Sequence, residues 1–370
     1  MVYSDMKNLV RQNILNVKNY VPGKPIEEVR RELGLDEVIK LASNENCLGP
    51  SPKAIRAIRR SLKDVNRYPD SSFFYLRKKI AGSLGIKEKE VVFGNGSDEI
   101  ICLAVRAFVE DGDEVIIAKP TFLIYEIVSQ IQNASVRFVP LDRDLRHDLK
   151  AMKEAVTNST KMVFIANPDN PTGTYVTKSE LDEFFKGLRD DLIVFIDEAY
   201  FEFANYGFKD YPNGMDYLRR PGVIVARSFS KAYGLAGLRI GYGISSPEVI
   251  QYMDMVREPF NVNSLAQAAA LAALEDKVFL KKTLAHVEKE KKFLYSAFQN
   301  MGLDCIKSAT NFIVVDVKRD CKEVFNVLLK DGVIVRDMKA WGLDTFIRVT
   351  VGTRAEDRKF LAALERAVVR

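Results

Sequence analysis

From about Glu90 to Ser245 the chain alternates short runs of Val, Ile and Phe with amphipathic segments of helical periodicity. The apolar runs are continuous, which is typical of strands buried on both faces. Strands that alternate with helices in this way predict a mainly parallel sheet covered by helices on both sides. This pattern restricts the fold to the α/β class.

The strands predicted in this region are Val91–Phe93, Glu114–Ala118, Val136–Val139, Met162–Ala166, Leu192–Ile196, Val223–Ala226 and Arg239–Ile244. The helices predicted between them include Ser97–Val109, Phe122–Gln132, Leu149–Val156 and Lys178–Leu188. Most strands therefore follow a helix, as a parallel sheet requires for its crossover connections.

After Ser246 the pattern changes to a helical stretch that continues to Gly302, with a long charged helix near Lys277–Gln299. The predicted elements beyond it are the strands Asn311–Val317, Val333–Arg336 and Phe346–Val351 and the helices Lys322–Leu329 and Arg354–Val369. We expect a large domain over residues 65–260 and a small α+β domain over 261–370, with the helical region 247–300 connecting the two. Residues 1–64 are expected to pack on the small domain.

The composition fits a globular protein larger than one small domain, with 370 residues, of which 47% are hydrophobic and 28% charged. The net charge of +5 is spread along the chain and predicts no nucleic-acid surface. No apolar run reaches membrane-spanning length, and the segment from Met1 to Tyr20 lacks the apolar core of a signal peptide.

The four cysteines lie far apart and the chain has two histidines, so a Cys/His metal site is not expected. Reduced thiols are typical of a cytoplasmic protein, and we expect that location.

The segment with the most chemical content begins at Ser228 and includes Ser230, Lys231 and, further on, Arg239. It follows an apolar strand, and ligands of open α/β sheets bind at the carboxyl ends of strands. Two hydroxyls and an arginine could bind a phosphate, and the lysine could form an imine. In isolation, so short a segment favours a lysine-containing surface turn, because short motifs recur by chance.

Asp197 ends a wholly apolar strand and is followed by Tyr200. A buried carboxylate needs a cationic partner, and a pyridinium nitrogen is one such partner. A metal ion or an arginine would be others. The chain has no GxxxxGK[ST] phosphate loop, so a nucleotide triphosphatase is not expected.

Two further segments follow predicted strands. The stretch Asn167–Gly173 has two Asx-Pro steps and a final glycine, which predict a rigid loop presenting Asn170. Backbone N–H groups of Gly96, Ser97 and Asp98 open a helix and could bind a phosphate or form an ordinary capped start. Tyr125 lies in the next predicted helix, where its ring could stack on a cofactor or belong to the core.

Together these segments resemble the fold-type I pyridoxal-phosphate aminotransferases, and most of all the histidinol-phosphate aminotransferase branch. The resemblance runs from Leu41-Ala42-Ser43-Asn44-Glu45-Asn46 to Arg348-Val349-Thr350-Val351-Gly352. It implies a large domain with a mostly parallel seven-stranded sheet, a small domain, and a homodimer with shared active sites. The implied cofactor is pyridoxal 5′-phosphate.

The resemblance also implies roles for individual residues. Lys231 would be the Schiff-base lysine, Asp197 the partner of the pyridine nitrogen, and Asn170 and Tyr200 the ligands of the ring oxygen. Tyr125 would stack on the ring. The phosphate would lie among Gly96, Ser97, Asp98, Ser228, Ser230 and Arg239, with Tyr68 reaching it from the neighbouring subunit. On the substrate side the resemblance implies Arg348 for a carboxylate, Arg336 for a phosphate, and Asn44 and Tyr20.

The implied reaction is transamination between L-histidinol phosphate and 2-oxoglutarate, giving imidazole-acetol phosphate and L-glutamate, as in histidine biosynthesis. Two other activities remain open at this point. An aromatic-amino-acid aminotransferase could use the same pocket. A threonine-phosphate decarboxylase, which is a lyase, has a very similar motif set and also needs a phosphate pocket.

Overall fold

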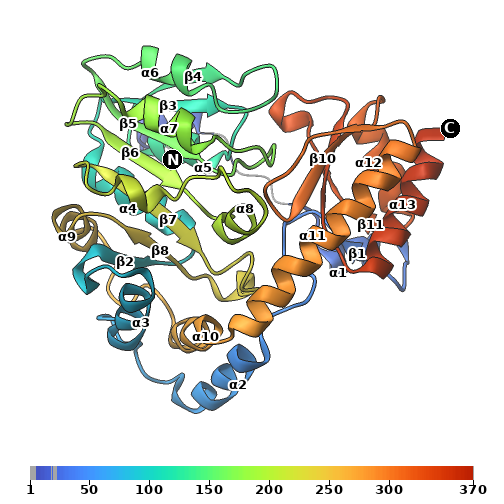
Figure 1. The fold of residues 1–370 in the computed structure, drawn as a ribbon, viewed down its shortest axis with the longest axis horizontal. Coiled ribbons are helices and arrows are strands. Elements are labelled where there is room, and N and C mark those ends of the chain that lie inside the picture. The colour runs from blue at the N-terminus through green and yellow to red at the C-terminus, as the bar shows by residue number, and fades with distance from the viewer. Residues whose placement is uncertain (1–5, 18, 20–22, 370) are drawn as a thin grey trace, which may run out of the picture.

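The computed structural model describes residues 6–17, 19 and 23–369, and a seven-stranded sheet forms the centre of its larger body (Figure 1). The strand order is β2-β8-β7-β6-β5-β3-β4, and β8 alone runs antiparallel to its neighbours. The strands are β2 (Val91–Gly94), β3 (Glu114–Lys119), β4 (Ser135–Pro140), β5 (Thr160–Ala166), β6 (Ile193–Asp197), β7 (Val223–Ser228) and β8 (Gly241–Ile244). The predicted α/β fold with a mostly parallel seven-stranded sheet is confirmed.

Helices cover both faces of this sheet. One face packs against α4 (Ser97–Phe108), α5 (Ile124–Ile131) and α9 (Pro247–Met255). The other packs against α2 (Pro52–Ser61), α3 (Phe74–Leu84), α6 (Leu149–Glu154), α7 (Lys178–Phe185) and α10 (Ser264–Leu274). Side chains alternate along each strand, so Val92 joins the first core while Val91 and Phe93 join the second. This double burial explains the continuous apolar runs in the sequence.

The smaller body contains a four-stranded antiparallel sheet in the order β12-β13-β10-β9. Its strands are β9 (Asp304–Cys305), β10 (Phe312–Asp316), β12 (Arg336–Asp337) and β13 (Phe346–Thr350). The helices of this region are α1 (Ile26–Leu33), α11 (Lys277–Asn300), α12 (Cys321–Lys330) and α13 (Arg354–Val369). The long helix α11 runs from the large body to the small one, and α8 (Phe201–Gly207) of the large body contacts it (Figure 1).

The strand predicted at Val333–Arg336 is two strands in the structure. β11 (Val333–Ile334) pairs in parallel with β1 (Ile39–Lys40), whereas β12 pairs with β13. The chain changes partner at Val335, which is buried like its neighbours. A continuous apolar run shows that a segment is buried but does not show where its pairing partner changes.

The helices α2 and α10 pack against each other, and Ala54, Ala266 and Ala270 belong to the same core as the large sheet. Small side chains allow the two helices to approach closely. Helix α10 therefore packs with the large sheet, which differs from the boundary at residue 261 expected from the sequence. The N-terminal segment is divided between the two bodies as well, because β1 joins the small body while α2 joins the large one.

No helix in the described part of the chain is long and apolar enough to span a membrane.

One prediction concerns the core of the small body. Leu294 of α11 is fully buried, whereas Val278 of the same helix is 82% exposed. We expect Leu294→Ala to lower the free energy of unfolding by about 2–5 kcal/mol in urea titrations, because it leaves a cavity. Val278→Ala is the matched control and should change it by less than about 0.5 kcal/mol. Equal effects of the two substitutions would contradict the placement of this helix.

Candidate active site

A cavity of about 320 Å³ lies where the parallel strands of the large sheet end, bordered by residues of the small body. Asp197, the last residue of β6, lines this cavity together with Asn170 and Lys231 from the segments that follow β5 and β7. Parallel strands place their carboxyl ends at one edge of a sheet, which explains why segments far apart in the sequence meet here.

Most residues predicted for the site line this cavity. They are Asn44, Ser97, Asp98, Tyr125, Asn170, Asp197, Tyr200, Ser228, Ser230, Lys231, Arg239, Arg336 and Arg348. Gly96 is not among the lining residues but lies next to the guanidinium of Arg239, which is. Tyr68 is 83% exposed outside the cavity, where its ring stacks on Phe260. Tyr20 lies outside the described residues.

Asp197 is a buried carboxylate at the end of β6. Its side chain accepts hydrogen bonds from the Tyr125 hydroxyl at 2.7 Å and from the Ala199 N–H at 2.9 Å. Burial nevertheless raises the pKa of Asp197 to about 6, because desolvation disfavours the charged form more than these two bonds favour it. The site thus contains a carboxylate that a cation in the cavity would stabilise.

Tyr125 lines the cavity, and the stacking of its ring on a cofactor stays a prediction. The Tyr125 ring is buried and stacks on Phe164 of β5, with 4.8 Å between centroids. Phe122, which was not predicted as a site residue, also lines the cavity and is half-buried. The sequence could have indicated Phe122, because it stands nearer the end of β3, where site residues gather.

One end of the cavity is suited to an anion. Helix α4 begins there, and Gly96 before it has a φ of +82°. A Cβ at Gly96 would lie 2.5 Å from Nη2 of Arg239, so the close approach of this guanidinium requires glycine. Arg239 also pairs with Asp98 at 2.9 Å. Together with Ser97, Ser228 and Ser230, this end offers a helix N-terminus, hydroxyls and a cation, which are the groups that bind phosphate.

Lys231 follows β7 and Tyr200 follows β6, and both line the cavity. The Lys231 ammonium is 5.5 Å from the centroid of the Tyr200 ring. Asn44 donates to the Tyr200 hydroxyl at 2.8 Å, and its own backbone N–H donates to Thr350 at 2.9 Å. The N-terminal segment and the small body therefore complete the cavity that the large sheet begins.

Two arginines reach the cavity from the small body. Arg348 of β13 is buried; it donates to the Asn170 side chain and to the Ala42 carbonyl, the latter at 2.9 Å. Arg336 of β12 lies directly opposite Arg348 in the strand register and is half-buried.

Among the described residues there is no cluster of His, Cys, Asp or Glu that could hold a metal ion.

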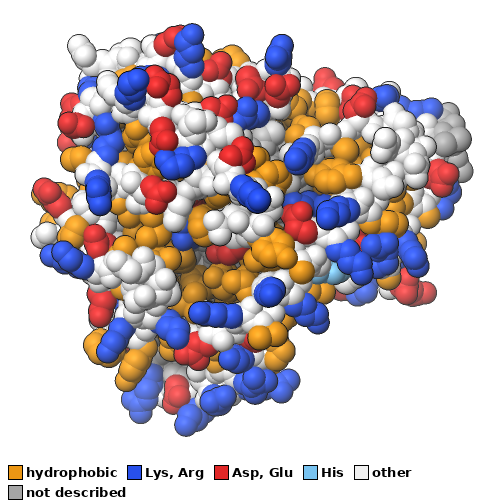
Figure 2. Space-filling view, viewed as in Figure 1, with side chains coloured by type: hydrophobic (Ala, Val, Ile, Leu, Met, Phe, Trp, Pro, Cys, Tyr) orange, Lys and Arg blue, Asp and Glu red, His pale blue; other side chains and the backbone are white. Residues whose placement is uncertain are grey.

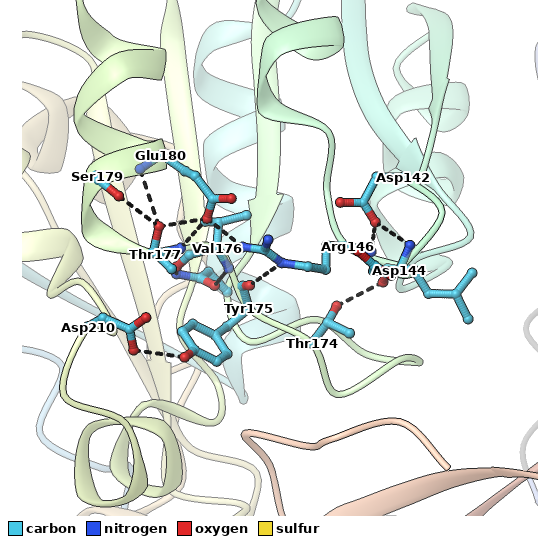
Figure 3. A network of polar contacts seen from close by, with 12 residues as sticks. Asp142, Asp144, Arg146, Thr174, Tyr175, Val176, Thr177, Ser179, Glu180 and Asp210 are labelled. Atoms are coloured by element: carbon cyan, nitrogen blue, oxygen red, sulfur yellow. Dashed lines mark hydrogen bonds and ion pairs between the residues drawn. The ribbon is translucent and has the colours of Figure 1, made fainter. Parts of the chain in front are cut away.

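The loop that carries Asn170 is braced on both sides. Upstream, Asp169 accepts hydrogen bonds from Thr121 at 2.6 Å and Thr172 at 2.8 Å. Downstream, a polar network fixes the chain that leads into α7 (Figure 3). Its contacts join Arg146 to the Tyr175 carbonyl and to Glu180, Thr174 to the Leu145 carbonyl, Tyr175 to Asp210, and Thr177 to Glu180 in a capping box. Asn170 is thus held between two fixed points.

Comparisons with known proteins agree with this architecture. The family model described as aminotransferase class I and II matches residues 36–364. The histidinol-phosphate aminotransferase of Moorella thermoacetica is 48% identical over 356 residues, covering 96% of this chain and 92% of that protein. Histidinol-phosphate aminotransferase 2 of Carboxydothermus hydrogenoformans is 46% identical, covering 96% and 98%.

Among solved structures, the histidinol-phosphate aminotransferase of Sinorhizobium meliloti in complex with pyridoxal 5′-phosphate superposes with a TM-score of 0.89. It is 30% identical, and the match covers 96% of both chains. The fold, the cavity and these matches define an enzyme that transfers amino groups. The chain belongs to the class I and II aminotransferase family.

The raised pKa of Asp197 predicts a pH-dependent effect on stability. Its carboxyl has a pKa of about 6 in the folded protein against an ordinary value of 3.8. Above pH 6 the carboxyl is charged in both the folded and the unfolded chain, and its burial lowers the free energy of unfolding. Below pH 4 it is protonated in both states, and this loss of stability disappears. We expect Asp197→Asn to raise the melting temperature of the cofactor-free protein at pH 8 by roughly two degrees or more. The gain should shrink as the pH falls from 6 towards 4.

Asp182 provides a control of opposite sign, because hydrogen bonds from Tyr217 and Lys178 lower the pKa of its carboxyl. Asp182→Asn should not raise the melting temperature at pH 8. A stabilisation by Asp197→Asn that is as large at pH 4 as at pH 8 would contradict the burial of a charged carboxylate.

Proposed function

We propose that this aminotransferase uses pyridoxal 5′-phosphate to interconvert L-histidinol phosphate and 2-oxoglutarate with imidazole-acetol phosphate and L-glutamate, in histidine biosynthesis. The observation that carries the proposal is the combination, in one cavity, of buried Asp197, Lys231 and the facing pair Arg336 and Arg348. The similarity to histidinol-phosphate aminotransferases over nearly the whole chain supports it.

The cavity fits the cofactor at two places. Gly96 leaves room for Arg239 beside the N-terminus of α4, which suits a phosphate. Asp197 is a desolvated carboxylate whose pKa is raised by burial, which suits a protonated ring nitrogen. When bound, pyridoxal phosphate acts as an electron sink for the negative charge left at Cα of an amino acid.

We assign the following roles to the residues around the bound cofactor. Asp197 would hold the proton on the ring nitrogen, while Tyr200 and Asn170 would hydrogen-bond to the ring oxygen. Lys231 would hold the cofactor at rest and would move the proton at Cα of the substrate. The cofactor phosphate would lie among Gly96, Ser97, Asp98, Ser228, Ser230 and Arg239, with Asp98 contributing its backbone N–H. The Tyr125 hydroxyl, which donates to Asp197, orients that carboxylate.

The substrate pair explains the need for two arginines. Glutamate and 2-oxoglutarate carry carboxylates, whereas histidinol phosphate carries a phosphate and no carboxylate. A guanidinium binds either group in a bidentate manner. We assign the carboxylate to Arg348 and the phosphate to Arg336, with Asn44 beside them. Tyr20, expected on the substrate side, lies outside the described residues.

We further propose a homodimer in which the active sites are shared, and a cytoplasmic location. Aromatic side chains that would be costly to leave in water are exposed near residues 68–75, namely Tyr68, Phe74 and Tyr75, together with Phe260. Hydrophobic side chains also gather around the hollow at the centre of the face drawn in Figure 2. A second subunit covering the Tyr68 region would bring that tyrosine to the neighbouring cofactor phosphate.

Within each subunit we propose a large and a small domain, with α10 on the large one.

The substrate proposal predicts that the purified protein with pyridoxal phosphate converts histidinol phosphate and 2-oxoglutarate into glutamate. Phenylalanine should replace histidinol phosphate with kcat/KM lower by about tenfold or more, since it lacks the phosphate for Arg336. Glutamate formation is measured with a coupled dehydrogenase assay. Lys231→Ala is the inactive control and should retain no borohydride-reducible cofactor adduct by mass spectrometry.

Two outcomes would contradict the proposal. Equal or better turnover of phenylalanine or tyrosine would favour an aromatic-amino-acid aminotransferase. Release of CO₂ from threonine phosphate without formation of glutamate would favour a decarboxylase.

The shared site predicts complementation between two defective variants. In a hybrid of Lys231→Ala and Tyr68→Ala subunits, one site combines an intact Lys231 with the intact Tyr68 of the other chain. After mixing in equal amounts under conditions that exchange subunits, we expect about a quarter of the wild-type activity, because half of the dimers are hybrids with one intact site each. No recovery above the activity of the Tyr68→Ala protein would contradict the sharing of Tyr68.

A further inference from the structure

We propose that Trp341 is a positioning residue that holds Arg336 and Arg348 in place for acidic substrates, without touching the reacting atoms. This inference rests on the proposed function for the roles of the two arginines. Trp341 ends the short 3-10 helix Lys339–Trp341 between β12 and β13 and is half-buried. Nothing in its local sequence marks it as part of the site.

The two arginines need such a residue because of the strand register. Arg336 and Arg348 are direct partners across the antiparallel pair β12–β13, so their side chains leave the sheet on the same face. Two like charges placed opposite each other repel, and Arg348 is buried as well. Attractive contacts offset this repulsion while no substrate is bound, and for Arg348 they include Asn170, the Ala42 carbonyl and the Phe312 ring.

The indole of Trp341 is placed to attract both. The guanidinium carbon of Arg336 lies 5.1 Å from the ring centroid and that of Arg348 lies 6.0 Å from it. Both distances are within the range in which the negative face of an aromatic ring attracts a cation, and tryptophan is the strongest of the aromatic side chains in this respect.

A hydrogen bond fixes the indole to the large body. Nε1 of Trp341 donates to the Thr121 carbonyl at 3.0 Å, and the Thr121 hydroxyl donates to Asp169 at 2.6 Å. Asp169 is the neighbour of Asn170, which accepts from Arg348. The small body is therefore joined to the Asp169–Asn170 loop by two sets of hydrogen bonds. Arg348 bonds directly to Asn170, and Trp341 is linked to Asp169 through Thr121. Trp341 thus couples the position of both arginines to the loop that carries Asn170.

Two substitutions separate the aromatic face from the hydrogen bond. Trp341→Leu removes both, and Trp341→Phe keeps an aromatic face but lacks the N–H. For Trp341→Leu we expect KM for 2-oxoglutarate and for histidinol phosphate to rise about tenfold with kcat changed by less than about twofold, because the lost contacts act equally before and in the transition state. Trp341→Phe should show a smaller rise of KM in the same direction.

Phe185→Leu is the matched control. Phe185 also lies near an arginine, with the Arg220 guanidinium carbon 5.8 Å from its centroid, but it belongs to α7 away from the cavity. It should leave both KM values unchanged. Unchanged KM values in both Trp341 variants, or a fall in kcat at constant KM, would overturn the proposal. Should Trp341→Leu fail to fold, the KM values of Trp341→Phe alone decide.

Fluorescence gives a readout independent of turnover, since Trp341 is the single tryptophan of the chain. Titration of the cofactor-loaded protein with glutarate, an unreactive dicarboxylate, should change the emission of Trp341, and no change at saturating glutarate would overturn the proposal.

Exchange of label between 2-oxoglutarate and glutamate separates this inference from the proposed function. If histidinol phosphate were not a substrate, the exchange would still report the effect of Trp341 on Arg348.

Discussion

The shared direction of β5, β6 and β7 is the constraint on which the rest of the structure depends. Because these strands run parallel, Asn170, Asp197 and Lys231 leave the sheet at one edge although they are distant in sequence. The burial of both sheet faces fixes the register of each strand, since a shift by one residue would turn the apolar side chains to the wrong cores. The position of these three side chains is therefore a consequence of how the hydrophobic cores on the two faces are packed.

Asp197 shows how burial and chemistry are linked at this edge. The carboxylate is expensive to keep charged in an apolar environment, and the bonds from Tyr125 and Ala199 offset only part of that cost. A cation in the cavity would offset the remainder, so the binding of a cation, such as the protonated ring nitrogen proposed above, would stabilise the folded chain. The small body adds the opposite charge, because Arg336 and Arg348 bring positive groups to a cavity whose floor carries a carboxylate.

The sequence predicted the central sheet well because most of its strands are apolar on both faces and alternate with helices. It also predicted most cavity residues, because their motifs follow strands of the same sheet. It did not predict the pairing of Ile39 with Val333, since contacts across such a separation leave no local pattern. For the same reason the partners of Tyr125 and the contacts of Trp341 could not be predicted, because the packing of Phe164 or a carbonyl such as that of Thr121 is fixed only by the tertiary structure.

The antiparallel direction of β8 has a further consequence for the variation that this fold permits. Ser228 and Gly241 are partners in the β7–β8 pair, and Phe229 donates its N–H to the Ile240 carbonyl at 3.1 Å, so the loop between them is closed at its base. This closed loop carries both Lys231 and Arg239. An inserted or deleted residue would change the spacing between the amine and the guanidinium and could not be absorbed by sliding a strand. Relatives of this enzyme should therefore differ in length at the outer connections, while the loop from Ser228 to Gly241 keeps a constant length.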